Sequence, residues 1–238
     1  MGSYLALAGL AGLAAVERKG FLQAMLSRPV ALGPIAGLAL GDAAGGLLVG
    51  APLELLWLGS VNLGAALPVH EALGTCAVAG GAILAGRALG TGATPATAAL
   101  ALLVAAPLAL VGRRLDRLVE TDVNERLADR AERLCSAGAI AAAVRTNLAG
   151  LALPFGIAAL LAPLGAAAAR FVVPPVLRAL PGLERPLEAG WIAFTAFAAA
   201  AGAKALRAKG APAVFLSAFA ATAVAGATLL FWRLEVRP

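Results

Sequence analysis

The chain has 238 residues, of which 61% are hydrophobic and 13% are charged, and its mean hydropathy is +0.89. These values exclude an ordinary soluble domain and indicate an integral membrane protein. The formal net charge of +6 comes from basic residues dispersed among acids, which is typical of membrane-flanking loops and argues against nucleic-acid binding.

Small apolar residues dominate, chiefly Ala, Leu and Gly, and no stretch alternates with period two. This composition predicts an all-α, polytopic membrane protein rather than a membrane β-barrel. The run from Tyr4 to Val16 has no basic region before it and no obvious cleavage point, so we interpret it as a retained first span. Further apolar runs cover residues 30–67, 72–89, 94–112, 137–169, 171–180, 188–203 and 212–232.

The run from Val30 to Leu67 is too long for one membrane span, because a single helix of this length would exceed about 50 Å. Helix breakers divide it, at Pro34, Gly41-Asp42, Gly45-Gly46 and Pro52. Glycines at every fourth residue from Gly33 to Gly45 favour close helix packing. We therefore predict broken or re-entrant helices in the N-terminal half.

Two carboxylates, Asp42 and Glu54, lie in this same apolar run. A charge at membrane depth is costly, so such residues are candidates for function. Two interpretations of Glu54 stay open: it lines a site, or it pairs with an arginine or caps a broken helix. For Asp42, which follows a glycine at a chain break, helix capping is favoured over ligand contact.

The segment from Arg113 to Arg133 carries six arginines and six acids. Val119, Val123 and Leu127 form a narrow apolar stripe, which predicts a charged amphipathic helix over 113–136. Its arginines place it on the cytoplasmic side, as either a docking surface for a soluble partner or a solvated connector.

After Gly138 the chain is apolar again, and its prolines predict a division into short helices. Arg145 and Asn147 are the only strongly polar residues in the first part of this region. The dividing prolines are Pro154, Pro163, Pro174, Pro175, Pro181 and Pro186.

The stretch SRPVALGPIAGLALGDAAGGLLVGAPLELLWLGSVNLGAALP, from Ser27 to Pro68, resembles the membrane subunit IIC of the mannose/fructose/sorbose family of the sugar phosphotransferase system (PTS). The SRP start, the Gly-Asp, the VGAxLELxWLG block and the following GAxxP occur in order. The stretch LDRLVETDVNERLADRAERL, from Leu115 to Leu134, resembles the charged helix of the same family.

The resemblance implies one IIC-like membrane domain over 1–238, with N-terminal spans in 1–112, the charged helix in 113–136 and C-terminal spans in 137–238. It implies a subunit of the bacterial inner membrane that works with a IID membrane subunit, in a higher IIC-IID oligomer, to take up a hexose. Soluble IIA and IIB carriers would hold the phosphate. We therefore expect no catalytic residue, phosphorylated residue, metal or cofactor in this chain.

A sugar presents many hydroxyl groups, so its site needs carboxylate or amide acceptors and an aromatic plane. Glu54, Asn62 and Gln23 are candidates for hydrogen bonding, Trp57 for the aromatic surface, and Asp42 for a further contact.

The chain departs from the family after GAxxP. Where the family has a second proline, an Asn or Asp and then a Thr, this chain has Val69-His70-Glu71-Ala72; it also has Gly45 where a threonine is common. His70 and Glu71 are candidates for a proton-sensitive gate or site element.

Three functions follow as hypotheses. The first is a sugar-translocating PTS subunit. The second is a permease-derived sensor or regulatory scaffold that binds sugar or phosphocarriers without transport, which the altered loop supports. The third is an ion-coupled transporter, which would need titrating carboxylates in the membrane.

Overall fold

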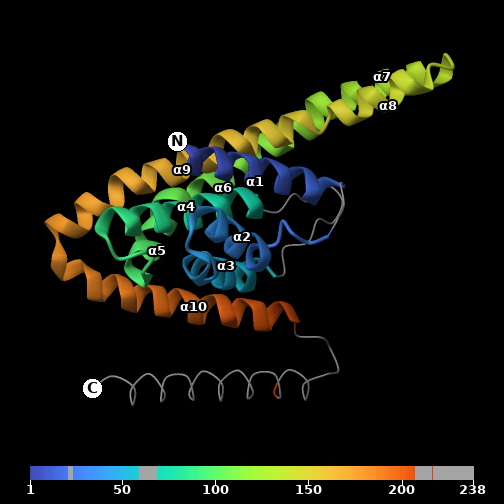
Figure 1. Cartoon of the computed structure of the whole chain (residues 1–238). Helices are drawn as coiled ribbons and strands as arrows, with labels where there is room; N and C mark the ends of the chain where they lie inside the picture. Colours follow the sequence, from blue (N-terminus) through green and yellow to red (C-terminus); the bar gives the residue numbers. More distant parts are fainter. Residues whose placement is uncertain (21–23, 59–68, 207–215, 217–238) are drawn as a thin grey trace.

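A computed structural model of the chain describes residues 1–20, 24–58, 69–206 and 216 (Figure 1). The described residues form helices and no strand, which confirms the predicted all-α class. In chain order these are α1 (Gly2–Lys19), α2 (Pro29–Leu40), α3 (Ala43–Trp57), α4 (Glu71–Leu89), α5 (Pro95–Ala105), α6 (Pro107–Leu118), the π-helix η1 (Val119–Asn124), α7 (Glu125–Ser136), α8 (Ile140–Ala149), α9 (Ala152–Ala179), the 3₁₀-helix η2 (Pro181–Leu183) and α10 (Glu184–Leu206).

Helix α4 lies at the centre of the bundle, and every residue from Glu71 to Gly86 is buried. It packs against α9, α5 and α2, while α10 lies along the outer side of α3 (Figure 1). Among the described residues, three helical stretches are long and apolar enough to cross a bilayer: Glu71–Leu89, Pro95–Ser136 and Ile140–Ala179.

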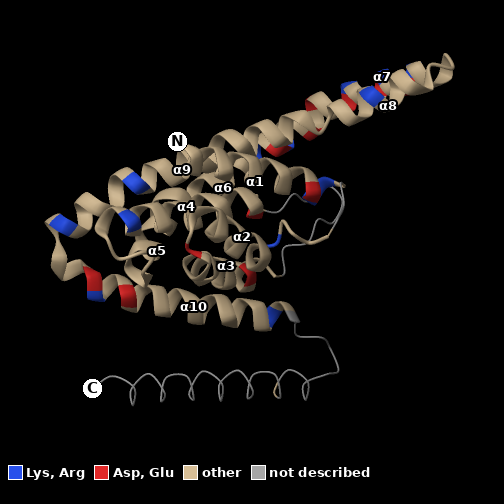
Figure 2. Cartoon of the chain, in the orientation of Figure 1, with Lys and Arg blue, Asp and Glu red and all other residues tan. Residues whose placement is uncertain are grey.

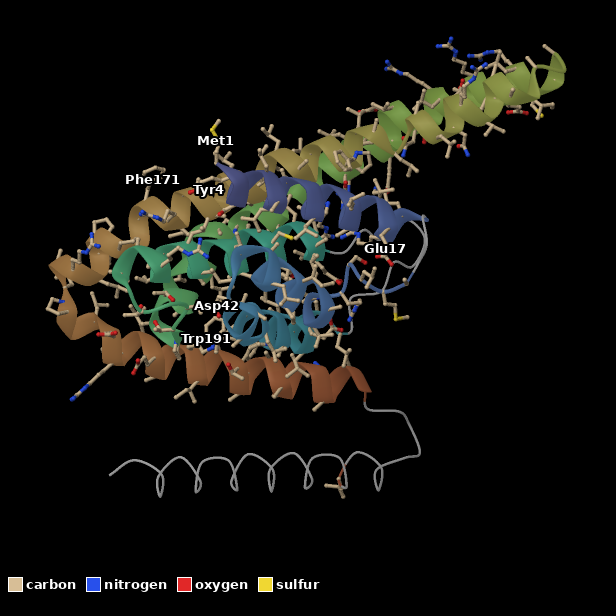
Figure 3. The ribbon with its side chains drawn as sticks, viewed as in Figure 1. Met1, Tyr4, Glu17, Asp42, Phe171 and Trp191 are labelled. Atoms are coloured by element: carbon tan, nitrogen blue, oxygen red, sulfur yellow. The ribbon has the colours of Figure 1, made fainter. Side chains whose placement is uncertain are left out.

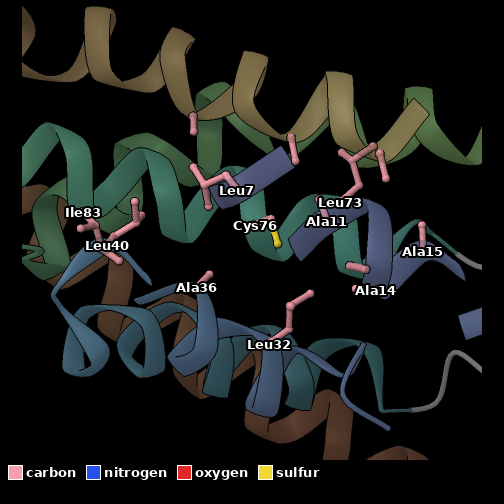
Figure 4. Close-up of a cluster of buried hydrophobic side chains, with 14 of the residues drawn as sticks. Leu7, Ala11, Ala14, Ala15, Leu32, Ala36, Leu40, Leu73, Cys76 and Ile83 are labelled. Carbon is pink, nitrogen blue, oxygen red and sulfur yellow. The ribbon is translucent and has the colours of Figure 1, made fainter. Parts of the chain in front are cut away.

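Small side chains form much of the core between α1, α2, α4 and α9 (Figure 4). Leu7 and Ala11 on α1 meet Leu73 and Cys76 on α4, all fully buried. Alanine and glycine at these contacts let the helix backbones approach closely, which is how helices associate where water does not drive their packing.

The long apolar run breaks into the α2–α3 pair. Gly41 ends α2 in the left-handed region, with φ 77°, and Asp42 begins α3 as its N-cap. The predicted glycine contact also forms, because a Cβ on Gly46 would collide with the backbone carbonyl oxygen of Gly33. The chain breaks at Gly41-Asp42, as predicted, whereas the breaks predicted at Pro34, at Gly45-Gly46 and at Pro52 are wrong, because α2 continues through the first and α3 through the other two. Re-entry of the α2–α3 pair into the membrane stays a prediction.

Helix α9 corrects one expectation. The chain remains helical from Ala152 to Ala179, straight through Pro163, Pro174 and Pro175. Sequence reasoning predicted short helices because a proline removes a backbone donor and crowds the preceding turn. Packing against α1 and α4 keeps the helix together, as membrane proteins allow when neighbouring helices support a proline site.

The charged segment forms the end of α6, then η1 and α7, and it turns back into α8 at Gly138. Helices α7 and α8 pack on each other and project from the bundle as a hairpin, with most of the charge on α7 (Figures 1 and 2). The membrane side on which this hairpin lies stays a prediction.

We predict that Gly46→Ala destabilises the protein, whereas Gly9→Ala does not. A methyl group at Gly46 overlaps the backbone of α2, and overpacking of this kind costs roughly 1–3 kcal/mol. Gly9 also lies inside a helix but has nothing within 4 Å of the added methyl group, so the change there brings only the better helix propensity of alanine. Thermal unfolding in detergent tests this, and equal midpoints for both variants would contradict the close contact.

Candidate functional site

Eight charged or titratable residues form a chain of contacts that runs from the end of α3 to η1, at the base of the α7–α8 hairpin. They come from the end of α1, the start of α2, the end of α3, the start of α4, and α6 with η1. We call them the polar cluster: Arg18, Lys19, Arg28, Glu54, His70, Glu71, Asp116 and Glu120.

Arg28 is the hub of one half of the polar cluster. Its Nε donates to Glu54 Oε1 at 2.9 Å, and its second terminal nitrogen also pairs with this oxygen. Its remaining nitrogen donates to Glu71 Oε2 at 3.3 Å. One guanidinium group therefore joins the starts of α2 and α4 to the end of α3.

Glu54 also satisfies the first turn of α2. Its Oε2 accepts from the Val30 backbone N–H at 3.3 Å, and Arg28 is the N-cap of that helix. A carboxylate here satisfies an orphan donor and the positive end of the helix dipole. Of the two interpretations of Glu54, the structure contains the arginine pair and the helix cap, and site lining stays a prediction.

His70 begins α4. Its Nδ1 accepts from the Leu73 backbone N–H at 3.2 Å, so Nδ1 carries no proton and a neutral ring carries its proton on Nε2. Burial, and then the charges of Arg18 and Lys19, lower the pKa of His70 well below its usual range, in keeping with that neutral form.

The other half of the polar cluster holds α1 against α6. Arg18 donates to Asp116 Oδ2 at 3.2 Å and to the Val69 carbonyl oxygen at 3.2 Å. Lys19 donates to Glu120 Oε1 at 2.5 Å, and Asp116 is completely buried. His70 Nε2 lies 3.8 Å from Asp116 Oδ2, which connects the two halves.

The predicted site residues do not all meet. Glu54, His70 and Glu71 lie in the polar cluster, whereas Asp42 begins the same helix that carries Glu54, roughly 18 Å away along its axis. Figure 3 shows Asp42 at the start of α3 and Glu17 near the end of α1.

Asp42 serves as a structural cap. Its carboxylate accepts from the backbone N–H groups of Gly45 at 2.7 Å and Ala93 at 3.1 Å. Arg87 donates to the Leu40 carbonyl oxygen at the end of α2. A cavity of about 430 Å³ adjoins them, lined by Gly41, Asp42, Ile83, Arg87, Gly90, Thr91, Gly92 and Ala93. A role of Asp42 in ligand binding stays a prediction.

Trp57 is 8% exposed and packs against Gly74 in the first turns of α4. It belongs to the core beside the polar cluster, and a role as a sugar platform stays a prediction. Gln23 and Asn62 lie outside the described residues.

Sequence reasoning did not single out Arg28 and Asp116. Arg28 belongs to the SRP start of the family block, but nothing in its local sequence distinguishes it from the other dispersed basic residues. Asp116 precedes Val119 by three residues, so it lies on the same helix face as the apolar stripe of Val119, on the side of the stripe that is nearer to the helix bundle. The position of an acid on this apolar face is the feature of the sequence that could have predicted the burial of Asp116.

The polar cluster has the chemistry to bind a polyol. Four carboxylates face three cations, and Arg28 approaches Oε2 of Glu71 while Oε1 remains available as an acceptor among the described residues. Carboxylate oxygens accept from sugar hydroxyl groups, and guanidinium groups donate to hydroxyl oxygens.

The long apolar helices, with partly buried charges between them, are typical of a multi-pass membrane protein. The family model for the sorbose-specific IIC component of the PTS matches residues 3–232. The chain belongs to this family and is a multi-pass protein of the bacterial inner membrane.

Among curated proteins, the chain is similar to the putative N-acetylgalactosamine permease IIC component 2 of Escherichia coli (strain K12). They share 48% identity over 50 residues, which is 21% of this chain and 38% of the relative. The matched segment therefore spans well under half of that relative's length.

Two solved structures share the fold over 99% of this chain and 96% of theirs. One, described as the structure of a membrane protein, has a TM-score of 0.69 at 20% identity. The other, the mannose transporter ManYZ in complex with microcin E492, has a TM-score of 0.58 at 22% identity.

We predict that Arg28→Gln lowers the free energy of unfolding by roughly 1–3 kcal/mol, because Glu54 and Glu71 lose their shared cation. Glu54→Gln costs less, since an amide keeps the shape and still accepts from Val30. Arg145→Gln is the control, because Arg145 is exposed and bonds only within its own helix among the described residues. Thermal unfolding gives the order of the three stabilities, and an Arg28→Gln variant as stable as the parent protein would refute the role of Arg28 as a hub.

Proposed function

We propose that this chain is the sugar-translocating IIC subunit of a phosphoenolpyruvate-dependent permease of the mannose family. It moves a hexose or hexosamine across the inner membrane, and a soluble IIB partner phosphorylates the sugar. The candidate sugars follow from the names of its family and relatives: sorbose, N-acetylgalactosamine and mannose.

One observation carries the proposal. The family block from Ser27 to Pro68 supplies α2 and α3, and its charged residues Arg28 and Glu54 meet Glu71 in a single partly buried network. A transporter for polyols needs such acceptors and donors inside an otherwise apolar bundle. Family membership over residues 3–232 supports the same function independently.

In this mechanism the sugar competes for groups that now satisfy each other. Hydroxyl groups donate to Glu54 and Glu71, while Arg28 turns from one carboxylate to the sugar oxygens. Because these groups are already paired with one another, exchanging a partner for the sugar costs less than exposing a lone charge in the membrane. Trp57, Gln23, Asn62, His70 and Asp42 are secondary candidates for contact or gating.

The proposed permease requires partners. A homologous IID membrane subunit completes the pathway, and IIC and IID subunits assemble into a higher oligomer. This chain contributes a single membrane domain to it. The soluble IIA and IIB carriers supply phosphate, so no phosphorylated residue is needed here. The α7–α8 hairpin faces the cytoplasm in this arrangement, as its arginines suggest.

A regulatory scaffold is the second candidate, and one observation favours it. Where the family has Asn or Asp, this chain has His70, and the following Glu71 binds Arg28. A network closed by the pairing of Arg28 with Glu71 would hold sugar or a carrier without releasing it. The two functions differ in whether a sugar phosphate forms.

The test is phosphoenolpyruvate-dependent phosphorylation of radiolabelled sorbose, mannose, N-acetylgalactosamine and other hexoses by membranes that contain this chain, its IID partner and the soluble carriers. We expect a sugar phosphate that disappears when this chain is omitted. No product from any sugar, with carriers active on a control permease, would instead favour the scaffold.

The same assay tests Glu54. Glu54→Gln should reduce sugar phosphorylation about 10-fold or more, the factor that corresponds to about 1.4 kcal/mol of lost interaction, while co-purification with IID stays intact. The control is Glu184→Gln, an exposed acid at the start of α10. Normal activity of Glu54→Gln would remove Glu54 from the site, and loss of assembly would assign it a purely structural role.

A further inference from the structure

The α7–α8 hairpin is joined to the bundle through an unusual helical segment. Between α6 and α7, residues Val119–Asn124 form a π-helix, whereas the flanking segments are α-helical. A π turn holds one more residue than an α turn, and such turns are frequently found at functional sites. Beyond it, α7 packs on α8 and lies away from the rest of the bundle (Figure 1).

Two ion pairs hold the near side of this π-helix. The last two residues of α1, Arg18 and Lys19, bind Asp116 on α6 at 3.2 Å and Glu120 in η1 at 2.5 Å. Lys19 also lies 3.7 Å from Asp116. The far side has no such clamp, because every charged residue of α7 is exposed and none forms an ion pair among the described residues.

The two ion pairs that Arg18 and Lys19 form with Asp116 and Glu120, which we call the clamp, contact the rest of the polar cluster. Arg18 donates both to Asp116 and to the Val69 carbonyl oxygen, one residue before the His70 cap. Arg18 Nε, His70 Nε2 and Asp116 Oδ1 are buried without a hydrogen-bond partner among the described residues. Unpaired buried atoms carry a penalty, so a rearrangement that satisfies them competes with the clamped state.

We propose that η1 is a hinge, clamped by Lys19 and Arg18, through which movement of the α7–α8 hairpin is coupled to the polar cluster. In the clamped state η1 keeps its π turn. Release of Glu120 lets the extra residue leave that turn. Because each residue of an α-helix advances it by about 100°, this change rotates α7 by about 100° relative to α6. The same release frees Arg18 to shift against Val69, at the entry to His70 and Glu71.

This inference goes beyond the proposed function and does not depend on it, because the hinge can be observed without sugar or soluble carriers. The native Cys135, exposed near the tip of the hairpin, takes one spin label, and Leu5→Cys on α1 takes the other. Cys76 is buried and is left in place. Pulsed electron resonance on the purified full chain in nanodiscs then gives the distribution of distances between the labels.

We expect one narrow distance population in the labelled parent protein. Glu120→Lys places a cation against Lys19 and should add a second population or shift the main one by several ångström, and Glu120→Gln should act in the same direction more weakly. The control is Glu132→Lys, an equal charge change at an exposed α7 position with no partner among the described residues, and it should leave the distribution unchanged.

Deletion of Thr121 separates a hinge from simple loosening. Thr121 is an exposed residue of η1, so its removal takes the extra residue out of the π turn without touching the core. In the Glu120→Lys background this deletion should restore one narrow population. An unchanged distribution in Glu120→Lys would overturn the clamp, and two populations that persist after the deletion would overturn the hinge.

Discussion

The structure depends on one constraint: a charge inside an apolar bundle must find a partner. Arg28 satisfies this constraint for Glu54 and Glu71, which come from different helices. In doing so it fixes where α2, α3 and α4 meet, and Glu54 also satisfies the first turn of α2. The remaining charges follow the same rule, with Asp116 and Glu120 held by the last residues of α1. Removing one partner would leave the others uncompensated, which costs more than the pair contributes.

The two ends of the α2–α3 pair have different characters. At one end, Asp42 and Arg87 satisfy backbone groups at helix ends, and neither side chain has a buried polar atom without a partner among the described residues. At the other end, Glu54 and His70 also cap helices, but charged side chains bind each other as well, and several buried atoms lack partners among the described residues. Backbone caps fix a structure, whereas side-chain pairs can exchange for a ligand. This contrast is why we assign binding to the polar cluster.

Much of this fold could be predicted from the sequence. Hydropathy identified the membrane class, and the glycine spacing with Gly41-Asp42 located the break between α2 and α3. Glu54 was identified as exceptional because it stands among leucines. The pairing of Glu54 with Arg28 could not be derived, because the two are 26 residues apart and only packing brings them together. The continuity of α9 was missed for a related reason, since neighbouring helices outweigh the local effect of Pro174 and Pro175.

The most direct test of the central claim is hydrogen–deuterium exchange of the assembled permease, with and without the sugar that it phosphorylates. If the polar cluster binds sugar, protection should appear in peptides that contain Arg28, Glu54 and the start of α4 around Glu71. Peptides around Asp42 and Arg87 should exchange at unchanged rates. Protection confined to the Asp42 end, with no change around Arg28, would contradict the account and move the site to the opposite end of α3.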